Sequence, residues 1–195
     1  MFLQQNDLKL AIDAIEKDEI IGLPTETVYG LAVNPYSSSA VEKLFALKGR
    51  DETKPVSLLV DSYDTFCNLD IVSDYGEVLP LYWPGPLTVI VETNEEFAQG
   101  VGTKNPGSIG VRVPDHKTAV SILKETGPLA VTSANRSGEK ETKSHTEAES
   151  IFNKDIPLYI KGDSILNEAS TVVDLRIEGG KILRQGSLLW PPSYC

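Results

Sequence analysis

The sequence predicts a single α/β domain in which helices cover a sheet of mixed parallel and antiparallel strands. Its 195 residues, 41% of them hydrophobic, are enough for one domain with a substantial core and few for two. Stretches with helical and with strand periodicity are interspersed along the chain, and some strands follow one another as hairpins without a helix between them. No internal repeat and no linker divides the chain.

The first half predicts two helices and four strands. Asn6 or Asp7 can cap a helix whose apolar residues recur at helical spacing through Ile15. Ser37 to Ser39 offer N-caps to a second helix with an apolar face that includes Val41 and Leu44. The expected strands are 19–24, 29–33, 56–60 and 87–92.

The second half continues the same mixture. Residues 109–113 predict a strand with Arg112 on one face, and 115–125 a helix capped by Asp115. Residues 128–135 read as a strand that runs into a polar turn, and the polar segment 136–150 as an exposed loop followed by a short helix. Residues 170–176 and 181–186 predict a terminal hairpin, and the proline-containing tail should be irregular.

Composition and missing motifs exclude several classes of protein. The net charge of -10 disfavours non-specific nucleic-acid binding unless the cations are gathered in one place. The N-terminus has no targeting signal and no apolar run is long enough to span a bilayer, so we expect a cytoplasmic protein without membrane contact. The two cysteines form no CxxC, and the sequence lacks the Walker, GxGxxG, GxSxG and HExxH patterns. With only two histidines, an enzyme of this sequence should act by binding and polarising charged substrates.

Four short stretches place hydroxyls and cations beside strand ends: "PTETVYGL" (24–31), "KGRDETKP" (48–55), "SIGVR" (108–112) and "VTSANRSG" (131–138). Each one alone has a simpler interpretation as a capped turn or as a helix end with favourable charges. That interpretation does not cover Lys54, which lies beyond the expected helix. Arg112 stands within an apolar strand, where an arginine needs an anionic partner or a cavity.

Together these stretches predict a local basic cavity for a polyphosphate or carboxylate ligand. One charge pair at 4 Å is worth about 4 kcal/mol at an effective dielectric near 20, so a few contacts can overcome the repulsion of an acidic protein. The proposed contributors are Lys48, Arg50, Lys54, Arg112, Arg184, Thr27, Thr132, Ser133 and Ser170.

Seven blocks carry a resemblance to a known family. "GLPTETVYGLAVNP", "LFALKGRDETKPVSLLV", "WPGPLTVIV", "GSIGVRVPDH", "VTSANRSG", "STVVDL" and "ILRQG" occur in the order found in YrdC-like proteins. The sequence resembles the L-threonylcarbamoyladenylate synthases of that family over residues 7–186. The resemblance implies the short, single-domain form, with a twisted mixed sheet around a concave basic cavity and a tail at 187–195.

The resemblance also implies an activity. Such enzymes are nucleotidyltransferases that join L-threonine, bicarbonate and ATP into threonylcarbamoyl-AMP and pyrophosphate. The product is passed to the tRNA threonylcarbamoyl-transferase machinery for the t6A37 modification. Mg²⁺ is expected to arrive with ATP, held by phosphate oxygens and water, with no protein ligand in the matching blocks.

The same resemblance implies roles for individual residues. Lys48 and Arg50 form the K-x-R signature of the reaction centre. The residues implied to bind ATP are Arg50, Lys54, Ser108, Ser133, Asn135 and Arg184. The residues implied to bind threonine are Thr27, Arg112, Thr132 and Ser170.

Two alternatives remain open at this level. One is a module that binds double-stranded RNA on its concave basic surface without ATP turnover; weak RNA binding would also accompany the enzyme. The acidic composition and the lack of aromatic stacking platforms count against such a module. The other is a YrdC-like paralogue that uses a different amino acid or carbamoyl substrate.

Overall fold

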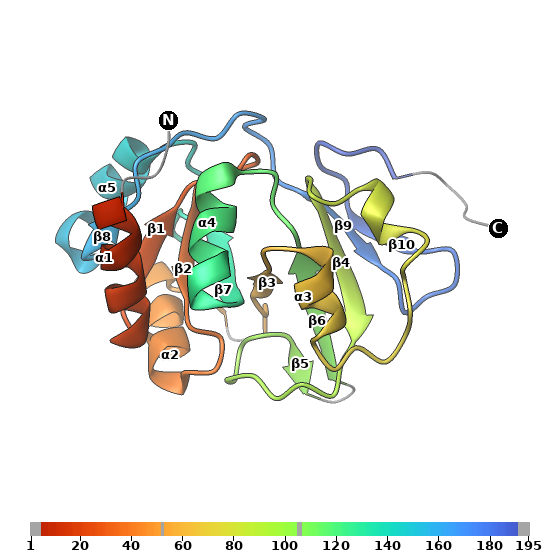
Figure 1. The fold of residues 1–195 in the computed structure, drawn as a ribbon. Helices are drawn as coiled ribbons and strands as arrows, with labels where there is room; N and C mark the ends of the chain where they lie inside the picture. The colour runs from red at the N-terminus through yellow and green to blue at the C-terminus, as the bar shows by residue number, and fades with distance from the viewer. Residues whose placement is uncertain (1–4, 52, 105–106, 191–195) are drawn as a thin grey trace.

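A twisted ten-stranded sheet runs through the centre of the molecule in the computed structural model, which describes residues 5–51, 53–104 and 107–190 (Figure 1). The strand order is β10-β9-β4-β6-β3-β7-β2-β1-β8, with β5 paired to β6. Three neighbouring pairs (β1 with β8, β3 with β6, β4 with β9) are parallel and the others antiparallel. The strands are β1 (Ile21–Leu23), β2 (Gly30–Val33), β3 (Ser57–Leu59), β4 (Leu87–Glu92), β5 (Thr103–Lys104), β6 (Gly107–Arg112), β7 (Leu129–Ser133), β8 (Leu158–Tyr159), β9 (Thr171–Asp174) and β10 (Lys181–Arg184).

Helices cover both faces of this sheet. Helices α1 and α4 lie side by side and bury residues such as Ile15 and Ile122 against one face (Figure 1). Helices α2, α3 and α5 bury Leu44, Phe66 and Phe152 in the other, larger core cluster. The helices are α1 (Gln5–Glu16), α2 (Ser38–Lys48), α3 (Tyr63–Cys67), α4 (Lys117–Thr126) and α5 (His145–Phe152), with 3₁₀ turns η1 (Leu79–Leu81) and η2 (Asn153–Asp155).

The alternation of side chains along each strand separates the two faces. On β2, Leu31 and Val33 belong to the larger core, whereas Ala32 between them packs under α1 and α4. Leu58 and Leu59 of β3 divide in the same way. A strand that is apolar at successive positions is thus buried on both sides, which is why residues 58–60 are apolar without a break.

The predicted mixed sheet with flanking helices is confirmed. Ser37 caps α2 by accepting a hydrogen bond from the backbone N–H of Ala40 at 3.2 Å, and β9 and β10 pair as the predicted antiparallel hairpin. The predicted cap of α4 is wrong: α4 begins at Lys117, and the Nδ1 atom of His116 accepts from the N–H of Ala119. The helix starts one residue later because His116 has the extended backbone of a capping residue and its ring supplies the acceptor for the first turn.

The elements that the sequence did not predict are short. Helix α3 has five residues and β5 and β8 have two each, which is too little for a hydrophobic period to be recognised. Within the expected tail, residues 187–190 form no helix or strand, and the Trp190 ring packs on Tyr82 with centroids 5.2 Å apart. The rest of the tail lies outside the described residues. The predicted boundary between the domain (7–186) and the tail (187–195) stays a prediction. No helix in the described part of the chain has the length and apolar character needed to cross a membrane.

Candidate active site

A cavity of about 410 Å³ opens where α1 and α4 leave their face of the sheet uncovered. Its floor is built from alternate residues of adjacent strands, because every second side chain points to the same face. Residues between them, such as Leu58 and Val111, point into the larger core. The strand positions on the floor include Ser57, Leu59, Thr88, Ile90, Ser108, Gly110, Arg112, Val131, Ser133 and Val172.

Gly110 leaves the middle of this floor free of a side chain. A Cβ atom at this position would lie 2.7 Å from the Oγ atom of Ser57 and 3.4 Å from Thr88 Cγ2. Such a contact is too close, so any side chain here would displace the hydroxyl groups that line the floor. The glycine therefore gives a ligand access to the strand backbone.

The wall of the cavity is strongly cationic. Four arginines line it, whereas Glu141 is the one carboxylate among its lining residues within the described chain; the arginines are Arg50, Arg112, Arg176 and Arg184. Arg176 is already paired with Asp174 through two hydrogen bonds of 2.8 and 2.7 Å. The remaining excess of positive charge favours an anionic ligand.

Arg50 is held in place by three groups. Its Nε atom donates to the carbonyl oxygen of Lys54 at 2.7 Å, and its Nη2 atom donates to that of Pro55 at 3.1 Å. Its Nη1 atom lies 3.4 Å from the Oγ1 of Thr132. These contacts orient the guanidinium group before any ligand binds, which limits the entropy lost on binding.

Arg184 is fixed to a different side of the cavity. Its Nε and Nη2 atoms donate to the carbonyl oxygen of Ser170 at 3.1 and 2.9 Å. The hydroxyl of Ser170 in turn lies 2.8 Å from that of Thr88. The last strand thereby contributes a cation to a cavity whose other arginines stand at positions 50, 112 and 176.

Arg112 is buried and forms an ion pair with Glu26. Its Nη2 atom donates to Oε2 of Glu26 at 2.6 Å, and the two side chains are only 7% and 6% exposed. Burial lowers the pKa of Arg112, and the neighbouring carboxylate acts in the opposite direction. The expectation that Arg112 has an anionic partner or lines a cavity is confirmed in both respects.

Lys48 lies behind the wall, not on it. Its Nζ atom donates to the carbonyl oxygens of Ser133 and Asn135, and the residue is 3% exposed. Burial lowers the pKa of Lys48 to about 8, with a further lowering by Arg50, while Glu141 has the opposite effect. The ammonium group thus ties the C-terminus of α2 to the turn that follows β7.

Eight of the eleven predicted site residues line the cavity: Thr27, Arg50, Ser108, Arg112, Thr132, Ser133, Ser170 and Arg184. Lys48, Lys54 and Asn135 are not among its lining residues. Lys54 is exposed, with its carbonyl held by Arg50. The side-chain amide of Asn135 donates to the carbonyls of Arg136 and Glu139, so it closes the turn beside the cavity.

Sequence reasoning missed several residues in or beside the cavity, among them Glu26, Thr88, Glu141 and Arg176. Two of them carried a usable signal. Thr88 is a hydroxyl inside the apolar strand "LTVIVE", and Glu26 is an acid inside "PTETVYGL", where an anionic partner for a buried arginine could have been sought. Glu141 stands in a polar segment without periodicity, and Arg176 stands at the end of the expected strand 170–176, so no pattern in the sequence marks either as part of the site.

The lowered pKa of Lys48 predicts a pH-dependent stability. The folded protein binds the proton of the Lys48 ammonium less tightly than the unfolded chain does. Below pH 8 the charged lysine therefore destabilises the folded state to its full extent, and this destabilisation is lost as the pH rises from 8 to 10.5. Between about pH 7 and 9.5 we expect the unaltered protein to gain on the order of 1–2 kcal/mol relative to Lys48→Met. Urea unfolding of both proteins at the two pH values measures this difference, and an unchanged difference would mean that the lysine titrates normally.

The described residues contain no group of three or more His, Cys, Asp or Glu side chains that could hold a metal ion. Glu141 is the one carboxylate within this part of the chain that lines the cavity. A divalent ion that enters with a polyphosphate needs few protein ligands, because it takes most of its ligands from phosphate oxygens and water. A cavity with one carboxylate can therefore accept it.

Comparisons with known proteins show which family this chain resembles along most of its length. The Sua5_yciO_yrdC family model, described as "Telomere recombination", matches residues 13–186. A threonylcarbamoyl-AMP synthase of Histophilus somni is 33% identical over 90% of this chain and 97% of its own length, and one of Rattus norvegicus is 32% identical over 93% and 68%.

Solved structures extend the similarity to three dimensions. The crystal structure of Pyrococcus abyssi Sua5 complexed with L-threonine superposes with a TM-score of 0.88 at 28% identity. It covers 96% of this chain, which spans 56% of that longer protein. Escherichia coli YciO has the same fold, with a TM-score of 0.85 at 23% identity. Since the family model and these relatives each cover most of the sequence, the chain belongs to the Sua5/YciO/YrdC family.

Proposed function

We propose that this protein is a threonylcarbamoyl-AMP synthase, which makes threonylcarbamoyl-AMP and pyrophosphate from L-threonine, bicarbonate and ATP. The observation that carries the proposal is the convergence of Arg50, Arg112 and Arg184 on one hydroxyl-lined cavity. The named activity of the relatives of similar length supports it.

The chemistry requires two anions to meet. The amine of L-threonine and bicarbonate give a carbamate with loss of water, and a carbamate oxygen then attacks the α-phosphorus of ATP. The bond from that phosphorus to the bridging oxygen breaks, and pyrophosphate leaves with the electron pair. Fixed arginines lower the repulsion between carbamate and phosphate and stabilise the charge that develops during transfer.

Two neighbouring sets of residues are assigned to the two substrates. Arg112 offers a guanidinium to the threonine carboxylate, a geometry suited to a paired hydrogen bond. Thr27, Thr132 and Ser170 provide hydroxyls for the same substrate. The residues assigned to the nucleotide are Arg50, Lys54, Ser108, Ser133, Asn135 and Arg184.

Lys48 and Arg50 remain the proposed reaction centre, with different contributions. Arg50 reaches the phosphates from the wall, whereas Lys48 acts from behind it through the turn that carries Ser133. Mg²⁺ would enter with ATP and supply charge neutralisation at the phosphates. No carboxylate cluster of the described residues competes for that ion.

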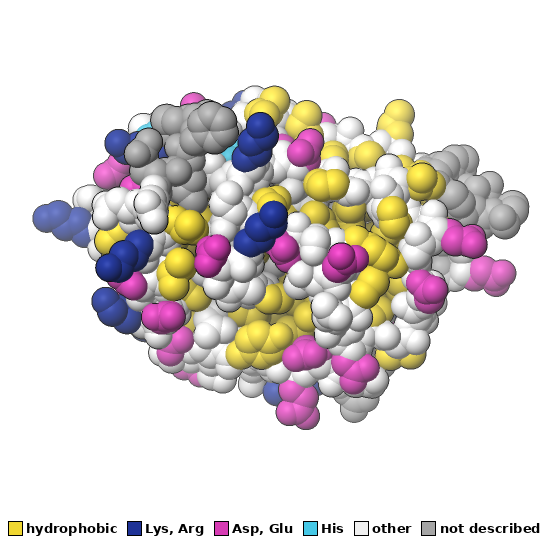
Figure 2. All heavy atoms as spheres, in the orientation of Figure 1, with side chains coloured by type: hydrophobic (Ala, Val, Ile, Leu, Met, Phe, Trp, Pro, Cys, Tyr) yellow, Lys and Arg dark blue, Asp and Glu magenta, His cyan; other side chains and the backbone are white. Residues whose placement is uncertain are grey.

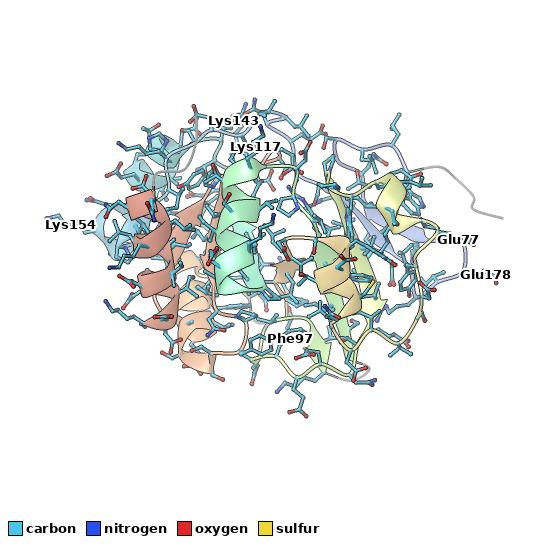
Figure 3. The ribbon with its side chains drawn as sticks, viewed as in Figure 1. Glu77, Phe97, Lys117, Lys143, Lys154 and Glu178 are labelled. Carbon is cyan, nitrogen blue, oxygen red and sulfur yellow. The ribbon has the colours of Figure 1, made fainter. Side chains whose placement is uncertain are left out.

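The product would pass to the tRNA-modifying machinery, and a cytoplasmic location stays a prediction. Lys and Arg side chains on the face in Figure 2 stand among Asp and Glu and form no continuous basic surface. Lys117 belongs to α4 and Lys154 to η2, and Lys154 projects from the edge of the molecule (Figure 3). On this face the dispersion leaves no extended basic surface of the kind that an RNA-binding module presents to phosphates.

Pyrophosphate release from ATP tests the proposal, measured with L-threonine, bicarbonate or both omitted. We expect release only when both are present. Release that is supported by serine and not by threonine would change the substrate and retain the mechanism. Salt-sensitive RNA binding without any release would overturn the assignment in favour of an RNA-binding module.

A further inference from the structure

We infer that Glu26 is a positioning residue that holds the Arg112 guanidinium in the orientation needed to bind the carboxylate of the amino-acid substrate. The inference rests on the proposed function, because it concerns the same cavity. It assigns a role to a residue that does not itself line the cavity.

The contact between the two side chains is short and shielded from water. The Nη2 atom of Arg112 donates to Oε2 of Glu26 at 2.6 Å, which is short for a charge-assisted hydrogen bond. Counted over the whole residue, backbone included, Arg112 is 6% exposed and Glu26 is 4% exposed. Because the pair is buried, dissolved salt screens the attraction between the two charges only weakly. The attraction can therefore hold the guanidinium in one orientation.

The backbone around Glu26 is fixed from two sides. The carbonyl oxygen of Glu26 accepts hydrogen bonds from the N–H groups of Ile165 and Leu166, at 3.1 and 2.8 Å. On the next residues, the hydroxyls of Thr25 and Thr27 lie 2.9 Å apart, and Thr25 donates to the carbonyl of Val28. The carboxylate therefore sits on a rigid turn and can act as a fixed reference for its partner.

Arg112 is fixed from the opposite side by the sheet. It ends β6, pairs with Leu59 of β3, and its carbonyl oxygen accepts from the N–H of Val60 at 3.0 Å. Its Nε atom is buried and has no hydrogen-bond partner among the described residues. Within the described part of the chain, the ion pair is the one side-chain hydrogen bond that Arg112 makes, so Glu26 is the group that selects the rotation of the guanidinium.

Charge gives a second reason for the pair. Arg184 lies near enough to act electrostatically on Arg112, and two like charges in one low-dielectric cavity repel. The Glu26 carboxylate compensates one of them. It uses one N–H group of a guanidinium that has five, and so leaves donors for a substrate carboxylate.

Binding measurements on the full chain test the inference, with L-threonine and ATP titrated separately by calorimetry. Glu26→Ala should weaken L-threonine binding at least about tenfold and leave ATP binding within about twofold, because only the threonine contact depends on Arg112 orientation. Glu26→Asp should behave like Glu26→Ala, since the shorter side chain withdraws the oxygen. Glu26→Gln keeps an acceptor of the same reach, so its L-threonine affinity should stay within about threefold or tighten as positive charge increases.

A double-mutant cycle asks whether Glu26 acts through its partner. In an Arg112→Ala background, the additional change Glu26→Ala should have no further effect on L-threonine affinity. Glu19→Ala is the matched control: Glu19 forms an exposed pair with Lys43 at 3.5 Å, and its loss should change neither affinity.

The outcomes separate this inference from the proposed function. Unchanged L-threonine affinity in Glu26→Ala, additive losses in the cycle, or a tenfold loss in Glu26→Gln with normal ATP binding would each overturn the positioning role. If the unaltered protein binds ATP but not L-threonine, the proposed function fails and the inference fails with it. Where Glu26→Ala loses both ligands through unfolding, Glu26→Asp decides: a folded Glu26→Asp protein with unchanged L-threonine affinity would overturn the positioning role.

Discussion

Replacing Arg50 by alanine is expected to lower kcat/KM for pyrophosphate release at least about 10²- to 10³-fold, with the protein still folded. A preorganised donor aimed at developing charge is worth about that much in other enzymes. Arg50 qualifies because the carbonyls of Lys54 and Pro55 hold its guanidinium on the cavity wall. Initial rates at saturating and at limiting ATP would separate a loss of turnover from a loss of binding.

Arg136→Ala is the matched control for this experiment. Arg136 belongs to the turn after β7, but its guanidinium stacks on Phe152 at 5.5 Å and donates to the carbonyl of Leu47, outside the cavity. Its removal should leave the rate within about twofold, as for other exposed substitutions. A near-normal rate in Arg50→Ala would show that the reaction centre has been assigned to the wrong part of the cavity.

Lys48→Ala is expected to reduce turnover by a factor of about 100 or more, although the lysine does not line the cavity. Without the ammonium group, the carbonyls of Ser133 and Asn135 lose their buried donor, and the turn that carries Ser133 loses its tie to α2. A displacement of about 1 Å at a reacting group can cost that factor. Initial rates, with the unfolding midpoint measured in parallel, test the prediction.

Lys43→Ala provides the comparison on the same helix. Lys43 is exposed and pairs with Glu19 at 3.5 Å, so its loss should change neither the rate nor the midpoint appreciably. A Lys48→Ala protein with normal turnover would exclude Lys48 from the reaction centre. A protein with normal folding and lost turnover would support its action through the turn.

Much of the fold could be predicted because its signals are local. Ser37 caps α2 as expected, since capping depends on a hydroxyl and on the next three residues. The hairpin of β9 and β10 follows from two apolar strands around Glu178, Gly179 and Gly180. Helix α3 and strand β8 escaped because five and two residues carry no measurable period, and packing alone decides them.

Most residues of the candidate site could be predicted from the sequence, but the contacts between them could not. Alternation along β6 placed Ser108 and Arg112 on one face, and both line the cavity. The acid that pairs with Arg112 lies 86 positions earlier in the chain, and the carbonyls that hold Lys48 lie 85 and 87 positions later. Pairings at such separations leave no trace in a single sequence, because they arise only when distant strands become neighbours.

The sequence by itself determined that this chain folds as one α/β domain, that its cations gather beside strand ends, and that it resembles the YrdC-like family. Only the tertiary structure decided which of those cations share a cavity: Arg50, Arg112 and Arg184 do, whereas Lys48 turns behind the wall. The reason is physical. Periodicity and capping depend on neighbours within a few residues, whereas the direction of a buried charge is set by the partner that compensates its desolvation, and that partner is supplied by the fold.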